Sequence, residues 1–333
     1  MKALGPWVLG ATLLGLPALN AWAEVPDHLL YPTALLAPTL PTQEARVLPP
    51  GRWRVGLLAS LANTEVAGRD GGLRAVLDME IREWRLVLRR GLGKGLEAGL
   101  YLPWIQATSG WSDALIVWWH RTLGFSGRRQ ATHRFRYTLV KDGRAIVQQS
   151  TPVSGMGDSL VYLKRRLWRN ASTAGAALLH ATLPTGRARD GLGSGSWNAG
   201  GRLVVDWHPA RRWRVNAAAG VNVPGPYRGP VSVNLRPVYE LRAAAAYGLS
   251  PALEGFASLA LTTHPLAGFR GNLNNPASSP SLQLTLGACW RTRAGTRVVL
   301  ALGQDLSRTV PDVTLSLGVT FPWGSSSGPD ALP

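Results

Sequence analysis

Gly157-Asp158-Ser159-Leu160 is the stretch of this sequence that looks most like a catalytic motif. A serine that follows an acid at a strand-to-helix turn can act as a nucleophile, and hydrolases with this signature take their general base from a later Asp-x-x-His. No Asp-x-x-His occurs in the 333 residues, and the residues after Ser159 alternate as a strand would. We therefore expect that Ser159 is not a nucleophile.

The histidines and the cysteine offer no second reactive centre. No histidine lies three or four residues from another, the spacing that brings two imidazoles to one metal on a helix. One cysteine cannot form an intrachain disulfide, and Cys289 is far from the N-terminal region where a lipid anchor would need it. The sequence therefore predicts no enzyme, no metal site and no cofactor. The histidines considered are His28, His120, His133, His180, His208 and His264.

Acidic and basic side chains are the remaining candidates. The chain has 36 Lys and Arg against 19 Asp and Glu, a formal net charge of +17 at pH 7. These charges are spread singly instead of forming one stripe, which argues against a nucleic-acid partner. Many fall on one side of the strands described below, where they can pair across a lumen or line a small pore. The predicted lumen-lining residues are Arg54, Asp78, Glu80, Glu97, Arg202, Asp206, Arg212, Arg214, Glu240, Arg242, Glu254, Arg291, Arg297 and Asp305.

The segments that carry these charges alternate in residue type with a period of two, which is the period of a β-strand. Between Trp197 and Trp207, one row is apolar with an aromatic at each end and the other row is polar. This pattern is typical of a strand with lipid on one side and a polar lumen on the other. We predict that Ala199, Leu203, Val205, Val215, Ala217, Leu284 and Leu286 face lipid, and that Arg202, Asp206, Arg214, Asn216 and Gln283 face inward.

The N-terminus predicts export. Lys2, the apolar run from Trp7 to Leu19 and the small residues of Ala21-Trp22-Ala23 form a signal peptide of residues 1–23, cleaved before Glu24. No other segment has the ~20 apolar residues of a membrane helix, so a closed barrel is the remaining way to cross a bilayer. We expect the outer membrane of a Gram-negative bacterium, with its lipid, its lipopolysaccharide and the barrel-assembly machinery as partners.

Turn residues separate the strands by connections that are alternately tight and long, as outer-membrane barrels require. The expected fold is all-β: a transmembrane, antiparallel, up-and-down barrel of about twelve strands over residues 52–321. Residues 24–51 are expected in the periplasm, and the tail of residues 322–333 is expected to be disordered. Fourteen strands result if the hairpin of Arg134–Val140 and Arg144–Gln149 joins the wall; its thin apolar row favours an extracellular flap.

Two segments depart from this pattern. The apolar residues of the strand Arg74–Arg90 change phase after Ile81, which predicts a bulge at Arg82-Glu83. In the longest loop, Ala107 to Gln130, apolar residues recur at helical spacing, which predicts a short amphipathic helix that folds into the mouth or rests on the rim. Its rings and charges could hold an apolar or aromatic solute with an anionic group. The mouth residues are Trp111, Trp118, Trp119, His120 and Arg121.

Three phrases together carry a resemblance to a known family. They are Trp111 to Arg128, Gly155-Met156-Gly157-Asp158-Ser159-Leu160 running into Lys164, and Leu183-Pro184-Thr185-Gly186 followed by Gly191-Leu192-Gly193-Ser194-Gly195-Ser196. The chain resembles the DUF3187 family of proteobacterial outer-membrane β-barrel proteins, and its last phrases are also similar to barrels of phenol-degradation pathways and putative transporters. The resemblance implies an outer-membrane barrel of unassigned role and supplies no catalytic residues.

Two functions remain open at this point. The first is a narrow channel or binder for small solutes, and the second is a structural or envelope-interaction barrel with a filled lumen. An outer-membrane lipid hydrolase is less favoured, because no serine and histidine recur together on neighbouring inner rows.

Overall fold

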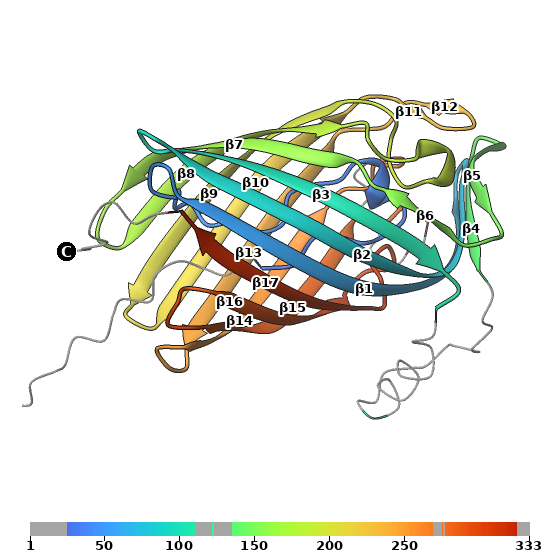
Figure 1. Cartoon of the computed structure of the whole chain (residues 1–333). Helices are drawn as coiled ribbons and strands as arrows, with labels where there is room; N and C mark the ends of the chain where they lie inside the picture. Colours follow the sequence, from blue (N-terminus) through green and yellow to red (C-terminus); the bar gives the residue numbers. More distant parts are fainter. Residues whose placement is uncertain (1–24, 111–121, 123–134, 269–274, 276, 325–333) are drawn as a thin grey trace, which may run out of the picture.

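The computed structural model describes residues 25–110, 122, 135–268, 275 and 277–324, and their regular secondary structure is almost entirely antiparallel β (Figure 1). The elements are η1 (Ala34–Leu36), β1 (Trp53–Asp70), β2 (Leu73–Gly93), β3 (Leu96–Thr108), β4 (Arg136–Lys141), β5 (Arg144–Gln149), β6 (Val153–Met156), β7 (Ser159–Arg169), β8 (Thr173–Leu183), η2 (Ala188–Asp190), β9 (Asn198–Ala210), β10 (Trp213–Pro224), β11 (Tyr227–Arg228), β12 (Ser232–Val233), β13 (Val238–Gly248), β14 (Leu253–Thr262), β15 (Ser281–Arg291), β16 (Arg297–Asp305) and β17 (Val313–Trp323).

Twelve of these strands form a closed barrel, which confirms the predicted fold. β1, β2, β3, β7, β8, β9, β10 and β13 to β17 pair in that order. β17 then pairs with β1, from Trp53↔Trp323 to Asn63↔Val313, and leaves no open edge in the wall. Closure gives the backbone donors and acceptors of each strand partners on both sides, as a bilayer requires. We call the end with the tight turns periplasmic and the other end extracellular, following the usual orientation of such barrels.

The outward row of β9 shows how the wall fits a membrane. Leu203 is 59% exposed, and it lies between the exposed rings of Trp197 and Trp207. The two tryptophans are ten residues apart. At ~3.3 Å per residue and a tilt of ~40°, this separation spans ~25 Å, the height of the apolar band of outer-membrane barrels. The opposite row of β9, which includes Arg202 and Asp206, is buried, as the alternation predicted.

The extracellular end is more elaborate than the sequence indicated. β1 and β2 continue as a paired hairpin to Asp70↔Leu73, with the turn at residues 71–72. The β4–β5 hairpin pairs with this extension of β2, from Leu73↔Lys141 to Asp78↔Arg136, and lies outside the twelve-strand wall (Figure 1). The flap was therefore the better of the two predictions for this hairpin.

The predicted bulge at Arg82-Glu83 was wrong. The register between β2 and β1 is continuous from Leu73 to Arg90, and β2 shifts against β3 only at Gly91/Gly93. The odd-numbered residues of β2 face inward along its whole length. Near the extracellular end these inward-facing residues are apolar, because they pack into a core there. At membrane height it is the outward-facing residues that are apolar. The change of phase thus marks a change of surroundings.

This buried core lies at the extracellular end, and we call it the extracellular cap. Tyr137 donates a hydrogen bond to the carbonyl of Gly191 (2.9 Å), and Tyr227 donates one to the carbonyl of Ala188 (2.6 Å), so the rings tie loops together across the mouth. Its fully buried members include Tyr31, Leu36, Leu77, Met79, Ile81, Leu139, Ile146 and Leu192.

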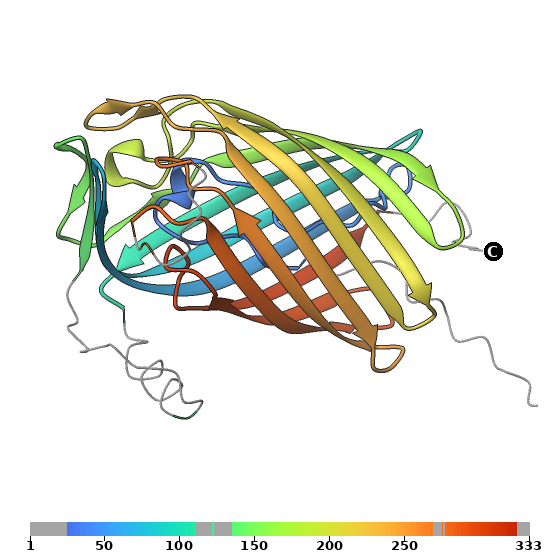
Figure 2. The same ribbon diagram turned by 180° about the vertical axis from the view of Figure 1, so that it is seen from behind.

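Residues 25–48 lie inside the barrel, where inner-wall side chains bind them, and this corrects the predicted periplasmic location for that part of residues 24–51. We call residues 25–48 the lumen segment. It rises to the cap, where η1 lies, and returns toward the start of β1, with an antiparallel bridge between Val25 and Thr42 joining its two arms (Figures 1 and 2). Its prolines lack an N–H, so it brings fewer backbone donors that need partners in an enclosed space.

Several predictions fall outside the described residues. They are the signal peptide, the helix and mouth residues of the 107–130 loop, and the tail from residue 325. The described part of the tail is not disordered, because β17 runs through Pro322 to Trp323. Within the described residues, no helix has the length and apolar character to cross a bilayer.

Candidate functional site

The lumen segment is held by a network of buried charges, of which Asp27 is the centre. Its carboxylate accepts hydrogen bonds from Thr42, both from the backbone N–H (2.7 Å) and from the hydroxyl (2.5 Å), and from the Ser258 hydroxyl (2.6 Å). It also pairs with Arg242 of the wall at 2.9 Å. Arg242 reaches Glu240 at 3.2 Å, so one guanidinium joins the segment to a wall carboxylate.

Polar side chains of the wall also bind the backbone of the lumen segment. Arg202 pairs with Glu240 at 2.6 Å and donates to the carbonyl of Pro41 at 2.6 Å. The amides of Asn216 and Asn222 donate to the carbonyls of Gln43 (3.0 Å) and Pro38 (3.2 Å). These contacts compensate for the absence of a ladder between the segment and any strand.

A second group of charges holds the returning arm near the periplasmic end. Glu97 of β3 lies 2.9 Å from Arg89 and 3.0 Å from Lys164, and it accepts a hydrogen bond from the N–H of Leu48 at 2.8 Å. Glu44 of the segment lies 3.7 Å from Arg54 and 3.8 Å from Arg89. The basic side chains of the wall thus face acidic side chains of both the wall and the lumen segment.

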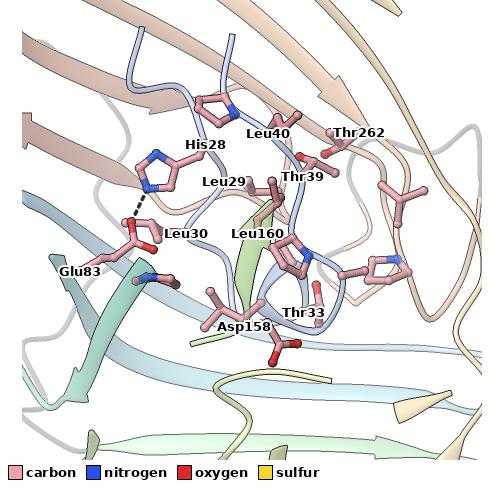
Figure 3. A pocket seen from close by; sticks show the side chains of 18 of the residues that line it. His28, Leu29, Leu30, Thr33, Thr39, Leu40, Glu83, Asp158, Leu160 and Thr262 are labelled. Atoms are coloured by element: carbon pink, nitrogen blue, oxygen red, sulfur yellow. Dashed lines mark ion pairs between the residues drawn. The ribbon is translucent and has the colours of Figure 1, made fainter. Parts of the chain in front are cut away.

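The rising arm leaves a small cavity beneath the cap. His28 Nε2 lies 2.7 Å from Glu83 (Figure 3). Glu83 also pairs with Arg85 at 2.8 Å. The cavity beside them has a volume of about 50 Å³ and is bordered by Leu40 and Leu160. A water needs roughly 10–15 Å³ of such volume, so the cavity has room for a few waters and not for an organic solute.

The charge pairs of this network stabilise the arrangement in which the segment fills the lumen. A buried ion costs several kcal/mol in desolvation, which a well-placed partner repays, whereas removal of one partner leaves an uncompensated charge at a cost of roughly 3–5 kcal/mol. Arg242 and Lys164 are both almost fully buried, and both face carboxylates. Loss of the pair between Asp27 and Arg242, which joins the segment to the wall, therefore favours movement of the segment and entry of water.

The structure brings most of the predicted lumen residues together on the inner face, with three exceptions. Asp78 and Glu80 have the parity of the outward row of β2, and Arg212 is exposed in the turn before β10. Asp305, on the inner row of β16, lies near the extracellular end next to Gln304. The buried inward residues are Glu97, Arg202, Asp206, Arg214, Glu240, Arg242, Glu254 and Arg297, and the partly buried ones are Arg54 and Arg291.

Sequence reasoning missed the residues that complete the network. Glu83, Arg85 and Arg89 share the inward parity of β2, and this signal was lost when a bulge was assumed beside them. Asp27 and Glu44 carried no detectable signal, because the segment has no strand period. The other missed residues are His28, Gln43 and Lys164.

The polar side chains of the Gly157-Asp158-Ser159 motif make hydrogen bonds that hold the structure together. Asp158 accepts hydrogen bonds from the backbone N–H groups of Gly186 (2.9 Å) and Ser194 (2.7 Å), and Ser159 shares a hydrogen bond with Thr185 (2.8 Å). A Cβ on Gly193 would lie 2.4 Å from the Asp158 carboxylate, so only glycine fits there. The two family phrases within the described residues therefore meet in space, where one carboxylate holds the loop of residues 185–196.

Asp158→Ala should loosen this loop, and Ser159→Ala should not. The first change leaves two partly or fully buried N–H groups without their acceptor, at a cost of about 1–3 kcal/mol; the second removes one hydroxyl bond while Thr185 keeps its other partners. Limited proteolysis of the loop and the free energy of unfolding in lipid measure both effects. Equal effects, or an esterase activity that Ser159→Ala abolishes in a folded barrel, would show that the motif does something else.

The histidines do not assemble into a metal centre in the described part of the chain, where no three His, Cys, Asp or Glu side chains are placed to share an ion. His264, in the loop after β14, shows the alternative role. Burial, with Lys141 nearby, lowers the pKa of His264 to about 3. The neutral ring accepts hydrogen bonds from the N–H groups of Leu266 and Ala267 at its Nδ1.

Comparison with solved structures shows a similar fold in a bacterial outer-membrane channel. The COG4313 outer membrane channel from Pseudomonas putida F1 is 15% identical, with a TM-score of 0.59 over 86% of this chain and 100% of that one. The KdgM porin (8% identity, TM-score 0.45, covering 81% and 99%) and the Pseudomonas putida toluene transporter TodX (13%, 0.39, covering 82% and 89%) are more distant.

Comparison of sequences gives the family. No curated protein sequence matches the chain. The family model described as "Protein of unknown function (DUF3187)" matches residues 30–323, which include most of the lumen segment and the whole barrel. The chain therefore belongs to the DUF3187 family.

Proposed function

We propose that this protein is an outer-membrane channel for small solutes, and that the lumen segment closes it. The observation that carries the proposal is that the lumen is filled by residues 25–48, a piece of chain outside the barrel ladder. The one bridge described for the segment, Val25↔Thr42, is internal to it. The segment can therefore leave without breaking the hydrogen bonds that hold the strands.

The wall behind the segment suits a water-filled passage. Departure of the segment would expose a row of charges that a hydrated pore tolerates and an apolar core does not. Around β14 to β17 and β1, the buried inner row also carries uncharged polar side chains beside a small apolar cluster that includes Phe256, Cys289 and Val299: Ser60, Ser258, Gln283, Thr285, Thr314 and Ser316. A polar lumen with a separable filling is consistent with a narrow channel, and the fold shared with a protein described as an outer membrane channel supports the same class.

A filled structural barrel is the second candidate, and the extracellular cap favours it. Tyr31 of the lumen segment is buried in the same core as Tyr137 and Tyr227, so release of the segment also disturbs the cap. On the channel proposal the cap and the segment open together. On the structural proposal they stay closed under all conditions.

Conductance of the purified protein in planar bilayers distinguishes the two. We expect the full mature chain to conduct weakly or in rare openings, and a chain without residues 25–48 to conduct steadily, because the wall remains closed and its lumen becomes wet. A matched variant replaces residues 25–48 by a Gly-Ser sequence of equal length, which keeps the tether and removes the anchoring side chains. It should conduct as the deletion does.

Folding of these variants is checked by heat-modifiable mobility on gels. If a folded deletion variant gives no conductance, the channel proposal is wrong and the filled structural barrel remains. In either case we place the protein in the outer membrane, surrounded by lipid and lipopolysaccharide after insertion by the barrel-assembly machinery, and we assign it no enzyme activity.

A further inference from the structure

A cavity of about 360 Å³ lies at the periplasmic end of the lumen, and we call it the periplasmic vestibule. It is large enough for a small organic anion, unlike the cavity beneath the cap. Arginines from four separate parts of the chain line it, and Glu44 is the only acidic residue among its described lining. The arginines are Arg46 of the lumen segment, Arg52 and Arg54 at the start of β1, Arg166 and Arg169 of β7, and Arg291 and Arg297 beside the β15–β16 turn.

The vestibule differs from the lumen above it in its balance of positive and negative charge. In the lumen, bases and acids alternate and pair at about 3 Å, as in Arg202 with Glu240. In the vestibule, Arg169 is close enough to Arg46 and Arg166 to be repelled by both. The one acid, Glu44, already faces Arg54 and Arg89.

The strand geometry directs Arg166 and Arg169 inward. A register shift between Arg166 and Trp168 brings Arg169 opposite Ala174, a buried residue of the inner row of β8. Arg166 has the parity of Tyr162 and Lys164, which are buried on the inner face of β7. Its neighbour Arg165 has the opposite parity and donates to the backbone carbonyl of Lys94 at 2.7 Å. Arg166 is therefore placed toward the vestibule, and not outward where lipid headgroups would surround it.

We propose that the periplasmic vestibule is a binding site for a small anion that carries phosphate or carboxylate groups. Guanidinium groups present a planar fork of donors that matches both kinds of oxyanion, and several of them around one cavity favour an anion with more than one negative charge. The proposal goes beyond channel function and does not depend on it, because the vestibule exists with the lumen closed.

Titration with inorganic pyrophosphate tests the site. We expect calorimetry of the full mature chain, in neutral detergent at fixed ionic strength, to show saturable binding of one pyrophosphate. The triple variant Arg46→Gln, Arg166→Gln, Arg169→Gln should bind at least about tenfold more weakly, since three charge-assisted contacts are lost. A matched control removes three exposed arginines from the extracellular end, Arg69→Gln, Arg74→Gln and Arg144→Gln, for the same change in net charge.

The outcomes separate a site from general attraction. Loss of affinity in the vestibule variant alone supports the proposal; equal loss in both triple variants, or no saturable binding by the unmodified protein, overturns it. Heat-modifiable mobility establishes that each variant is folded. Repeating the titration in nanodiscs identifies the source of the anion: if anionic lipid weakens pyrophosphate binding relative to zwitterionic lipid, a lipid headgroup occupies the vestibule, and if it does not, the ligand is a soluble anion. The binding measurement involves no conductance, so its failure and that of the channel proposal are distinguishable.

Discussion

Arg242→Met should open the barrel without unfolding it. Arg242 lies between Asp27 of the lumen segment and Glu240 of the wall. Its removal leaves the buried carboxylate of Asp27 without its cation and Glu240 with Arg202 alone, a change that costs roughly 3–5 kcal/mol when the rest of the site stays in place. Because the segment is outside the ladder, the least costly response is its departure, after which water hydrates both carboxylates.

Two measurements detect the departure of the lumen segment. Conductance in planar bilayers should rise toward that of the chain without residues 25–48, and added protease should cut within the segment while the wall remains resistant. Arg212→Met is the matched control, because Arg212 is exposed in the turn before β10 and the change in net charge is the same. It should leave both readings unchanged.

A double variant isolates the pair itself. Asp27→Asn added to Arg242→Met removes the carboxylate that lost its cation, and the amide can still use Thr42 and Ser258. We expect it to restore part of the closure, because the two residues are in contact and their effects are not additive. If Arg242→Met alone leaves the barrel closed and the segment protected, buried charge pairing does not hold the segment.

The wall of this protein was predictable and its filling was not, for a physical reason. Successive residues of a strand face opposite sides of the sheet, so the types of Leu203 and Arg202 alone indicate what surrounds each of them. The lumen segment has no such period, because each of its residues meets a different strand. Asp27 contacts residues more than 200 positions away, and nothing local records that contact.

The wrong bulge in β2 has a related origin. The prediction assumed that a change in which alternate residues are apolar marks a shift in backbone register. That assumption holds only while the inner face of the strand stays polar. In β2 the inner face changes from the charged network at Glu83 to the apolar cap at Ile81. Uncertain phase in a barrel strand can therefore indicate a capped lumen instead of an extra residue.

Leu203→Arg should destabilise the barrel by about 2–4 kcal/mol, the cost of an arginine near the middle of the membrane on the lipid-facing row. Leu203 lies between the two exposed tryptophans of its row. The free energy of unfolding in lipid bilayers measures the effect. The effect should be the same with and without residues 25–48, because the outer face does not contact the lumen segment.

Val204→Arg, one residue further, should behave differently in the two chains. On sequence grounds alone it faces a polar lumen and costs little, yet the structure buries Val204 in a cluster with Leu40 and Ala45 of the lumen segment. In the full chain the new charge has to displace the segment, so conductance should rise and the segment should become accessible to protease. In the chain without residues 25–48 the same arginine projects into water, and the free energy of unfolding should change far less than for Leu203→Arg. Equal destabilisation by both substitutions in that shortened chain would show that the assigned faces of β9 are wrong, whereas an undisturbed segment in full-length Val204→Arg would show that the cluster does not anchor it.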